Sequence, residues 1–166
     1  AGGRAIAVDV LAEALTVVTS PGRLQLLGTA PTVLVDAAHN PHGAAALATA
    51  LRESFAFEEW GVVLGVLADK DAAGIVAALA PIATRVFVTA PASDRAGDPD
   101  ALADLAEAAG LDVTVHGDLP TAADEARAWA VESAQRAVVI AGSVVLAGEA
   151  IAVSVAEGWK RGGADA

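Results

Sequence analysis

Short apolar runs alternate along the chain with longer segments in which apolar residues recur every three or four positions. Six runs rich in Val, Leu and Ile predict β-strands, at residues 23–27, 32–35, 61–67, 85–89, 113–116 and 137–141. Several of these runs are almost continuously apolar, which is typical of strands covered by helices on both faces. The alternation therefore predicts an α/β domain of stacked βαβ units around a parallel sheet.

Helices are predicted between these strands. Five segments show helical spacing of apolar residues or helix-end signals, at residues 44–55, 75–82, 98–110, 120–133 and 144–159. In the first, Ala44, Leu47 and Leu51 form one apolar face. In the second, Pro81 limits the helix. The third has clear ends, because Asp98 can cap its first turn and Gly110 can follow its last.

The sequence pattern at the start of the chain differs from that of the rest. Residues 1–19 contain a short helical pattern with nothing before it to pack on, and Ser20-Pro21-Gly22-Arg23 has the composition of a turn or hinge. We expect residues 1–19 to be a remnant of an upstream domain or a linker helix. Residues 20–166 then form one domain, which is an ordinary domain length.

Composition and charge narrow the classes of function. The net charge is −11 and the ten Lys and Arg residues are scattered, so a nucleic-acid partner is not expected. No apolar run reaches the roughly 20 residues of a membrane span, and there is no recognisable secretory signal. The absence of cysteine excludes disulfides, thiolate metal sites and cysteine nucleophiles. We therefore expect a cytoplasmic protein without membrane contact.

The loop after the second predicted strand is the densest in polar side chains. Asp36-Ala37-Ala38-His39-Asn40-Pro41-His42-Gly43 gathers a carboxylate, two imidazoles and an amide where a helix begins. Free N–H groups at a helix start attract phosphate, Asp36 can accept from ribose hydroxyls, and His39 can donate to a phosphoryl oxygen. The same residues also fit a structural role in which Asn40 caps the helix and both histidines are surface residues.

Two other loops carry candidate ligand-binding residues. Lys70, between Asp69 and Asp71, can neutralise a phosphate or carboxylate, although either aspartate can equally cap the next helix while Lys70 stays solvated. In Ala141-Gly142-Ser143, the glycine allows close backbone approach and Ser143 can cap a helix or bind substrate. Arg23 can reach a phosphate or remain a surface charge.

Several common catalytic motifs are missing. No G-x-x-x-x-G-K-[ST] loop is present to bind ATP phosphates, and no Gly-x-Gly-x-x-Gly follows a predicted strand. No nucleophile elbow of the G-x-S-x-G kind occurs either. The chain alone is therefore not expected to be a P-loop enzyme, a dinucleotide-binding enzyme or a hydrolase.

Taken in order, these loops resemble one family. Ser20-Pro-Gly-Arg23, Asp36-Ala-Ala-His-Asn-Pro-His-Gly43, Gly65-Val-Leu-Ala-Asp-Lys-Asp71, Thr89-Ala-Pro91 and Gly142-Ser143 are similar to motifs of folylpolyglutamate and dihydrofolate synthases, over nearly the whole chain. That family is related to the muramyl peptide ligases. The resemblance implies a Rossmann-like three-layer C-terminal domain with a mostly parallel sheet of about six strands. This domain closes over ATP that is bound to an N-terminal P-loop domain.

The resemblance also implies a reaction and its participants. ATP phosphorylates a folate or dihydropteroate carboxylate, and the amine of L-glutamate attacks the acyl phosphate, with Mg²⁺ held by the N-terminal domain. Nucleotide contacts fall to Arg23, Asp36, His39 and Asn40, with His39 as the catalytic residue. Glutamate contacts fall to the three residues of the other loops, Lys70, Asp71 and Ser143. We expect the full-length protein to be monomeric and the isolated chain to be inactive.

The chain differs from the family motifs at two places, and two other hypotheses for its function remain open. Ala37 stands where many members carry glycine, and Ala141-Gly-Ser143 replaces the commoner Thr-Gly-Ser, which bears mainly on the glutamate site. The same domain could belong to a muramyl or cyanophycin-type ligase, which the upstream sequence would distinguish. A free-standing nucleotide-binding or interaction module is the non-enzymatic alternative.

Overall fold

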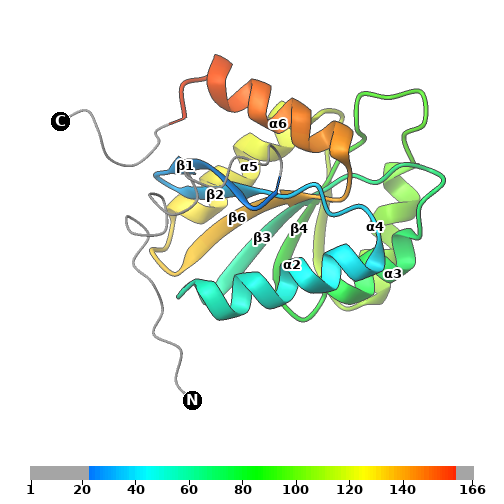
Figure 1. The fold of residues 1–166 in the computed structure, drawn as a ribbon, viewed down its shortest axis with the longest axis horizontal. Helices are drawn as coiled ribbons and strands as arrows, with labels where there is room; N and C mark the ends of the chain where they lie inside the picture. The colour runs from blue at the N-terminus through cyan, green and yellow to red at the C-terminus, as the bar shows by residue number, and fades with distance from the viewer. Residues whose placement is uncertain (1–22, 160–166) are drawn as a thin grey trace.

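A computed structural model describes residues 23–159, and Figure 1 shows their arrangement. Within these residues the strands are β1 Gln25–Thr29, β2 Thr32–Val35, β3 Glu59–Leu64, β4 Ala83–Val88, β5 Asp112–Val115 and β6 Arg136–Ala141. The helices are α2 Pro41–Ser54, α3 Ala72–Leu79, α4 Pro99–Ala108, α5 Leu119–Val131 and α6 Val144–Ala156.

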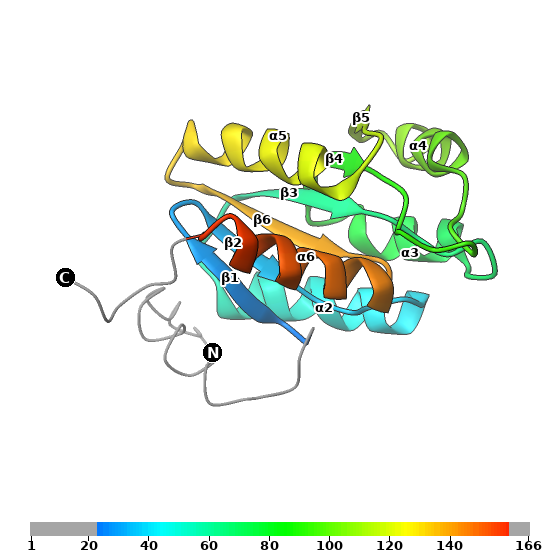
Figure 2. The ribbon, with the colours of Figure 1, turned by 90° about the horizontal axis from the view of Figure 1, so that it is seen from above.

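The strands form one mostly parallel sheet in the order β1-β2-β6-β3-β4-β5. Every neighbouring pair from β2 to β5 is parallel, whereas β1 runs antiparallel to β2 at the edge. The helices cover both faces: α5 and α6 lie on one side of the sheet and α2, α3 and α4 on the other (Figures 1 and 2). The predicted three-layer α/β architecture is confirmed.

The core explains why the strand sequences are so apolar. Alternate residues of one strand enter different clusters: Val139 of β6 packs under α2 and α3, while its neighbours Val138 and Ile140 pack under α5 and α6. Because both faces are covered, neither set of positions can be polar. No helix within residues 23–159 is long and apolar enough to cross a membrane.

Some predicted boundaries were wrong. The first strand lies at residues 25–29 instead of 23–27, and the third ends at Leu64 instead of Leu67. The last helix ends at Ala156, just before Gly158 with its positive φ of 61°, instead of near Trp159. The helix that includes Ile75 ends at Leu79, shortly before Pro81, as expected from that proline. The segment 1–19, expected to be an upstream remnant, lies outside the described residues.

Candidate functional site

The loops that follow β2, β6 and β3 meet at the carboxyl ends of three neighbouring strands. Hydrogen bonds join them: Gly142 N donates to Ala38 O at 2.9 Å, and Gly65 N donates to Ala141 O at 3.3 Å. Ligands of open parallel sheets bind at this end of the strands. The expected clustering of these three loops at one end of the sheet is confirmed.

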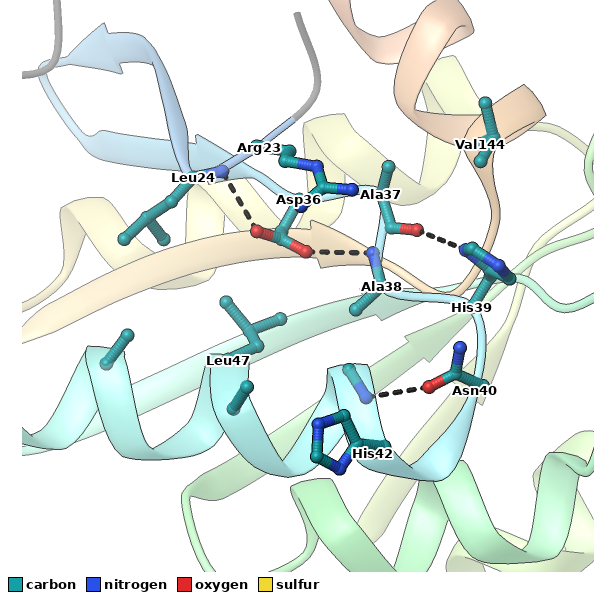
Figure 3. A pocket seen from close by; sticks show the side chains of 13 residues that line it. Arg23, Leu24, Asp36, Ala37, Ala38, His39, Asn40, His42, Leu47 and Val144 are labelled. Atoms are coloured by element: carbon teal, nitrogen blue, oxygen red, sulfur yellow. Dashed lines mark hydrogen bonds between the residues drawn. The ribbon is translucent and has the colours of Figure 1, made fainter. Parts of the chain in front are cut away.

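A cavity of about 500 Å³ lies over the loop after β2 and the first half of α2. Its polar lining includes Arg23, Asp36, His39 and Asn40, which are four of the predicted site residues (Figure 3). Val144 adds an apolar side chain from the first turn of α6. The tertiary structure therefore brings all four expected nucleotide-binding residues to one cavity.

Asp36 is held in place by the backbone on both sides. Its Oδ2 accepts from Leu24 N at 2.9 Å and its Oδ1 from Ala38 N at 2.8 Å (Figure 3). Leu24 has a positive φ of 39°, an uncommon conformation for a residue with a side chain. The Asp36 carboxylate thus fixes the turn that carries Arg23 against the loop after β2.

Burial dominates the titration of Asp36. Desolvation raises the pKa of its carboxyl above the ordinary value of 3.8, while the N–H groups of Ala38 and Leu24 and the charge of Arg23 oppose the rise. The side chain is only half-buried and still borders the cavity. A ligand hydroxyl would therefore share oxygens that already accept backbone hydrogen bonds.

The His39 ring is oriented by a contact within its own loop. Its Nδ1 lies 2.9 Å from Ala37 O, and because a carbonyl can only accept, Nδ1 carries the proton in this contact (Figure 3). Nε2 is then an acceptor in the neutral ring and a donor only in the charged ring. Donation from His39 Nε2 to a phosphoryl oxygen, as expected from the sequence, requires the imidazolium form.

Asn40 caps α2, as the structural interpretation of this loop predicted. Its side-chain oxygen accepts from Gly43 N at 2.7 Å, and Pro41 occupies the first turn. His42 is exposed on the same turn. Asn40, His42 and Gly43 all line the cavity, so the partial positive charge at the start of α2 lies at its edge.

Lys70 and Asp71 lie outside this cavity. Asp71 caps α3 by accepting from Gly74 N at 2.9 Å. Lys70 borders a separate, mainly apolar cavity of about 200 Å³ between α3 and α4. Its nearest carboxylate oxygen is Asp69 Oδ2, at 3.8 Å. The fold thus places Lys70 at the same end of the sheet but beside a different cavity, whereas Asp71 lines neither of the two cavities and caps α3.

Ser143 is fully buried, which bears on its expected contact with glutamate. Its hydroxyl accepts from Val145 N at 3.0 Å and Leu146 N at 3.4 Å, so it caps α6. Within the described residues, Ser143 lines neither the main cavity nor the one beside Lys70. Ser143 thus positions the start of α6 in this structure, and its contact with glutamate stays a prediction.

Two site features escaped the sequence interpretation. Val144 is 60% exposed and lines the main cavity, which an apolar residue directly after Gly-Ser could have suggested. Arg95, from the loop after β4, pairs with Asp69 beside Lys70. No local pattern indicates this pair, because the two residues lie 26 positions apart.

The described residues contain no group of three or more His, Asp or Glu side chains that could hold a metal ion. The cavity instead offers a guanidinium, an imidazole and a helix start. This set suits an anionic group such as phosphate.

Comparison with known proteins identifies the family. The profile described as Mur ligase, glutamate ligase domain, matches residues 22–144. The chain belongs to this family. The match covers β1 to β6 and the loops that build the cavity, and the resemblance inferred from the motifs is confirmed.

The proteins similar to this chain include enzymes that are named for folate substrates. The dihydrofolate synthase/folylpolyglutamate synthase of Mycobacterium tuberculosis is 44% identical over 155 residues, covering 86% of this chain and 32% of that protein. The structure of Mycobacterium tuberculosis folylpolyglutamate synthase complexed with ADP has a TM-score of 0.79 at 45% identity, covering 83% of this chain and 33% of that one. A bifunctional folylpolyglutamate synthase/dihydrofolate synthase with Mn, AMPPNP and L-glutamate bound has a TM-score of 0.70 at 28% identity, covering 81% and 32%. The chain thus spans about a third of the relatives it matches.

Proposed function

We propose that this Mur ligase domain is the C-terminal part of an ATP-dependent ligase that joins L-glutamate to folate or dihydropteroate. The observation that carries the proposal is the cavity at the carboxyl ends of β2 and β6, where Arg23, His39 and the start of α2 converge. The relatives named as folate enzymes support this substrate class over muramyl or cyanophycin substrates.

The side chains have distinct roles in the proposed reaction. Arg23 and the start of α2 attract the phosphates of ATP, and charged His39 donates from Nε2 to the transferred phosphoryl group. Asp36 fixes the turn that carries Arg23 and offers its remaining acceptor capacity to a ribose hydroxyl. Asn40 and Ser143 act as helix caps that hold these groups in position.

Lys70 binds glutamate in the proposed reaction. Its ammonium lies at the same end of the sheet, in a loop whose backbone contacts the loop after β6, and it suits a carboxylate of glutamate. Asp71 contributes indirectly, by capping the helix that follows. Phosphoryl transfer from ATP to the folate carboxylate then depends on positioning and charge compensation, with little covalent chemistry by the protein.

In this proposal a separate P-loop domain supplies the remaining parts. The sequence contains no P-loop motif for binding phosphate. Within residues 23–159, no group of three or more His, Asp or Glu side chains could hold Mg²⁺. We therefore place the Mg²⁺ ligands and most ATP contacts in an N-terminal domain of the same polypeptide. Closure of the two domains would also keep water from the acyl phosphate.

The test compares this chain alone with the ligase that joins it to its P-loop domain. ADP release that depends on ATP, glutamate and a folate or dihydropteroate substrate is measured for both. We expect turnover from the joined protein only. Turnover by the purified chain alone, or a joined protein that accepts only muramyl precursors, would reject the proposal.

A further inference from the structure

Backbone hydrogen bonds join the loops after β3 and β4 beyond the end of the sheet. Ala68 N donates to Arg95 O at 2.7 Å, Gly97 N donates to Val66 O at 2.9 Å, and Leu67 forms an antiparallel bridge with Ala96. At Gly97 there is no room for a side chain, since a Cβ atom would lie 2.8 Å from Val66 O. The backbone of Arg95 is therefore held at a fixed place beside the lysine loop.

Where these two loops meet, the side chains of Arg95 and Lys70 compete for one carboxylate oxygen of Asp69. Arg95 Nη2 donates to Asp69 Oδ2 at 2.7 Å, whereas Lys70 Nζ lies 3.8 Å from the same oxygen. The first distance is that of a charge-assisted hydrogen bond, and the second is too long for any hydrogen bond. Asp69 is thus engaged by Arg95, and the Lys70 ammonium is left without a direct bond to it.

We propose that Arg95 is a positioning residue for glutamate binding, which occupies the Asp69 carboxylate and so keeps the neighbouring Lys70 ammonium available for a carboxylate of the incoming amino acid. This inference rests on the proposed function, because it assumes that Lys70 receives glutamate. Arg95 itself does not border the cavity beside Lys70 and is not assigned a contact with substrate.

The causes of the lowered pKa of Asp69 agree with Arg95, and not Lys70, as its main partner. The hydrogen bond from Arg95 is the largest of the effects that lower the pKa of the Asp69 carboxyl, and the charge of Lys70 is the smallest. Asp69 is therefore ionised near neutral pH and, without Arg95, would attract Lys70. A direct Asp69–Lys70 pair would then compete with the substrate carboxylate for the same ammonium.

The availability of Lys70 can be measured on this chain without any enzymatic activity. The chain has two lysines, so brief labelling with an amine-specific acylating reagent reports Lys70 against Lys160 as an internal reference. Only the neutral amine reacts, and a directly bonded carboxylate favours the charged form. We expect Arg95→Gln to lower the relative labelling rate of Lys70 by about 1.5- to fivefold, the range for one exposed ion pair.

A second substitution distinguishes positioning from a purely structural effect. In the variant that combines Asp69→Asn with Arg95→Gln, no carboxylate remains to capture Lys70, and its labelling should return to the unsubstituted rate or above. Arg52→Gln, which changes an exposed arginine at the end of α2, is the matched control and should leave Lys70 unchanged. Unchanged labelling in Arg95→Gln, or no recovery in the double variant, would overturn the inference.

The same variants in the joined ligase test the link to glutamate. Arg95→Gln should raise the KM for glutamate by about 1.5- to fivefold, leave kcat and the KM for ATP nearly unchanged, and be rescued by Asp69→Asn. An unchanged glutamate KM with the labelling result intact would overturn the link between Arg95 and glutamate. A wild-type ligase with no glutamate-dependent turnover would instead reject the proposed function, while the labelling would still decide whether Arg95 controls Lys70.

Discussion

At the scale of single residues, the cavity beside α2 contains two histidines with different surroundings. His39 is partly buried, its ring is fixed by Ala37 O, and it borders the loops at the ends of the strands. His42 is exposed on the first turn of α2, three residues further along. The two side chains share residue type and neighbourhood, so they form a matched pair for separating catalysis from folding.

Replacing His39 by alanine in the joined ligase should reduce turnover far more than stability. Its loss leaves no core cavity and should lower the free energy of unfolding by less than about 1 kcal/mol. Losing a donor to developing charge in a closed site costs about 2.7 to 4 kcal/mol, so kcat should fall about a hundredfold or more. Steady-state kinetics and thermal unfolding measure the two effects.

His42→Ala is the control for this prediction, and it should change neither quantity appreciably. If His42→Ala reduced turnover as much as His39→Ala does, His39 would lose its catalytic assignment. The same follows if His39→Ala mainly lowered the melting temperature.

At the scale of elements, the start of α6 depends on close contact between two loops. Gly142 has a φ of 110°, and a Cβ atom there would lie 2.5 Å from Gly65 O. That approach lets Ser143 cap α6 and lets Val144 reach the cavity. The glycine is thus required by the backbone and not by a ligand.

Gly142→Ala should destabilise the domain by about 2 kcal/mol or more, because a residue with a side chain is strained at this φ and also meets the opposing carbonyl. Gly148→Ala, within the same helix, has open space around its Cβ position and should stabilise by about 0.5–1 kcal/mol. Urea unfolding of both variants measures the difference. Equal effects of the two substitutions would contradict this account of the loop.

At the scale of the whole molecule, the proposed function makes this chain one side of a nucleotide site. Its cavity supplies a guanidinium, an imidazole and a helix start, while the P-loop motif that binds the remaining phosphates is absent from the sequence. Under the proposed function, we expect this domain to gain most of its ATP contacts only when it closes on the P-loop domain.

The chain alone should therefore bind ATP weakly, with a Kd well above the micromolar range. Isothermal titration calorimetry of the isolated chain and of the joined ligase measures the contrast. Micromolar binding of ATP to the chain alone would show that its own residues suffice, and would contradict the division of the site between two domains.

The sequence by itself determined the fold class, the family and the position of the main cavity. Continuous Val and Ile runs indicate strands covered on both faces, and Asn40, Asp71 and Asp98 cap helices that local spacing alone predicts. These signals are local, since they depend on residues a few positions apart. The loop motifs were specific enough to indicate the family before any contact was known.

Only the tertiary structure decided how individual side chains are used. It buries the Ser143 hydroxyl as a cap, gives both Asp36 oxygens backbone donors, and brings Arg95 to the lysine loop. It also makes the edge strand β1 antiparallel. Each outcome depends on how loops from distant parts of the chain meet at the ends of the strands. Sheet register and close backbone approach determine that meeting, and neither leaves a local pattern in the sequence.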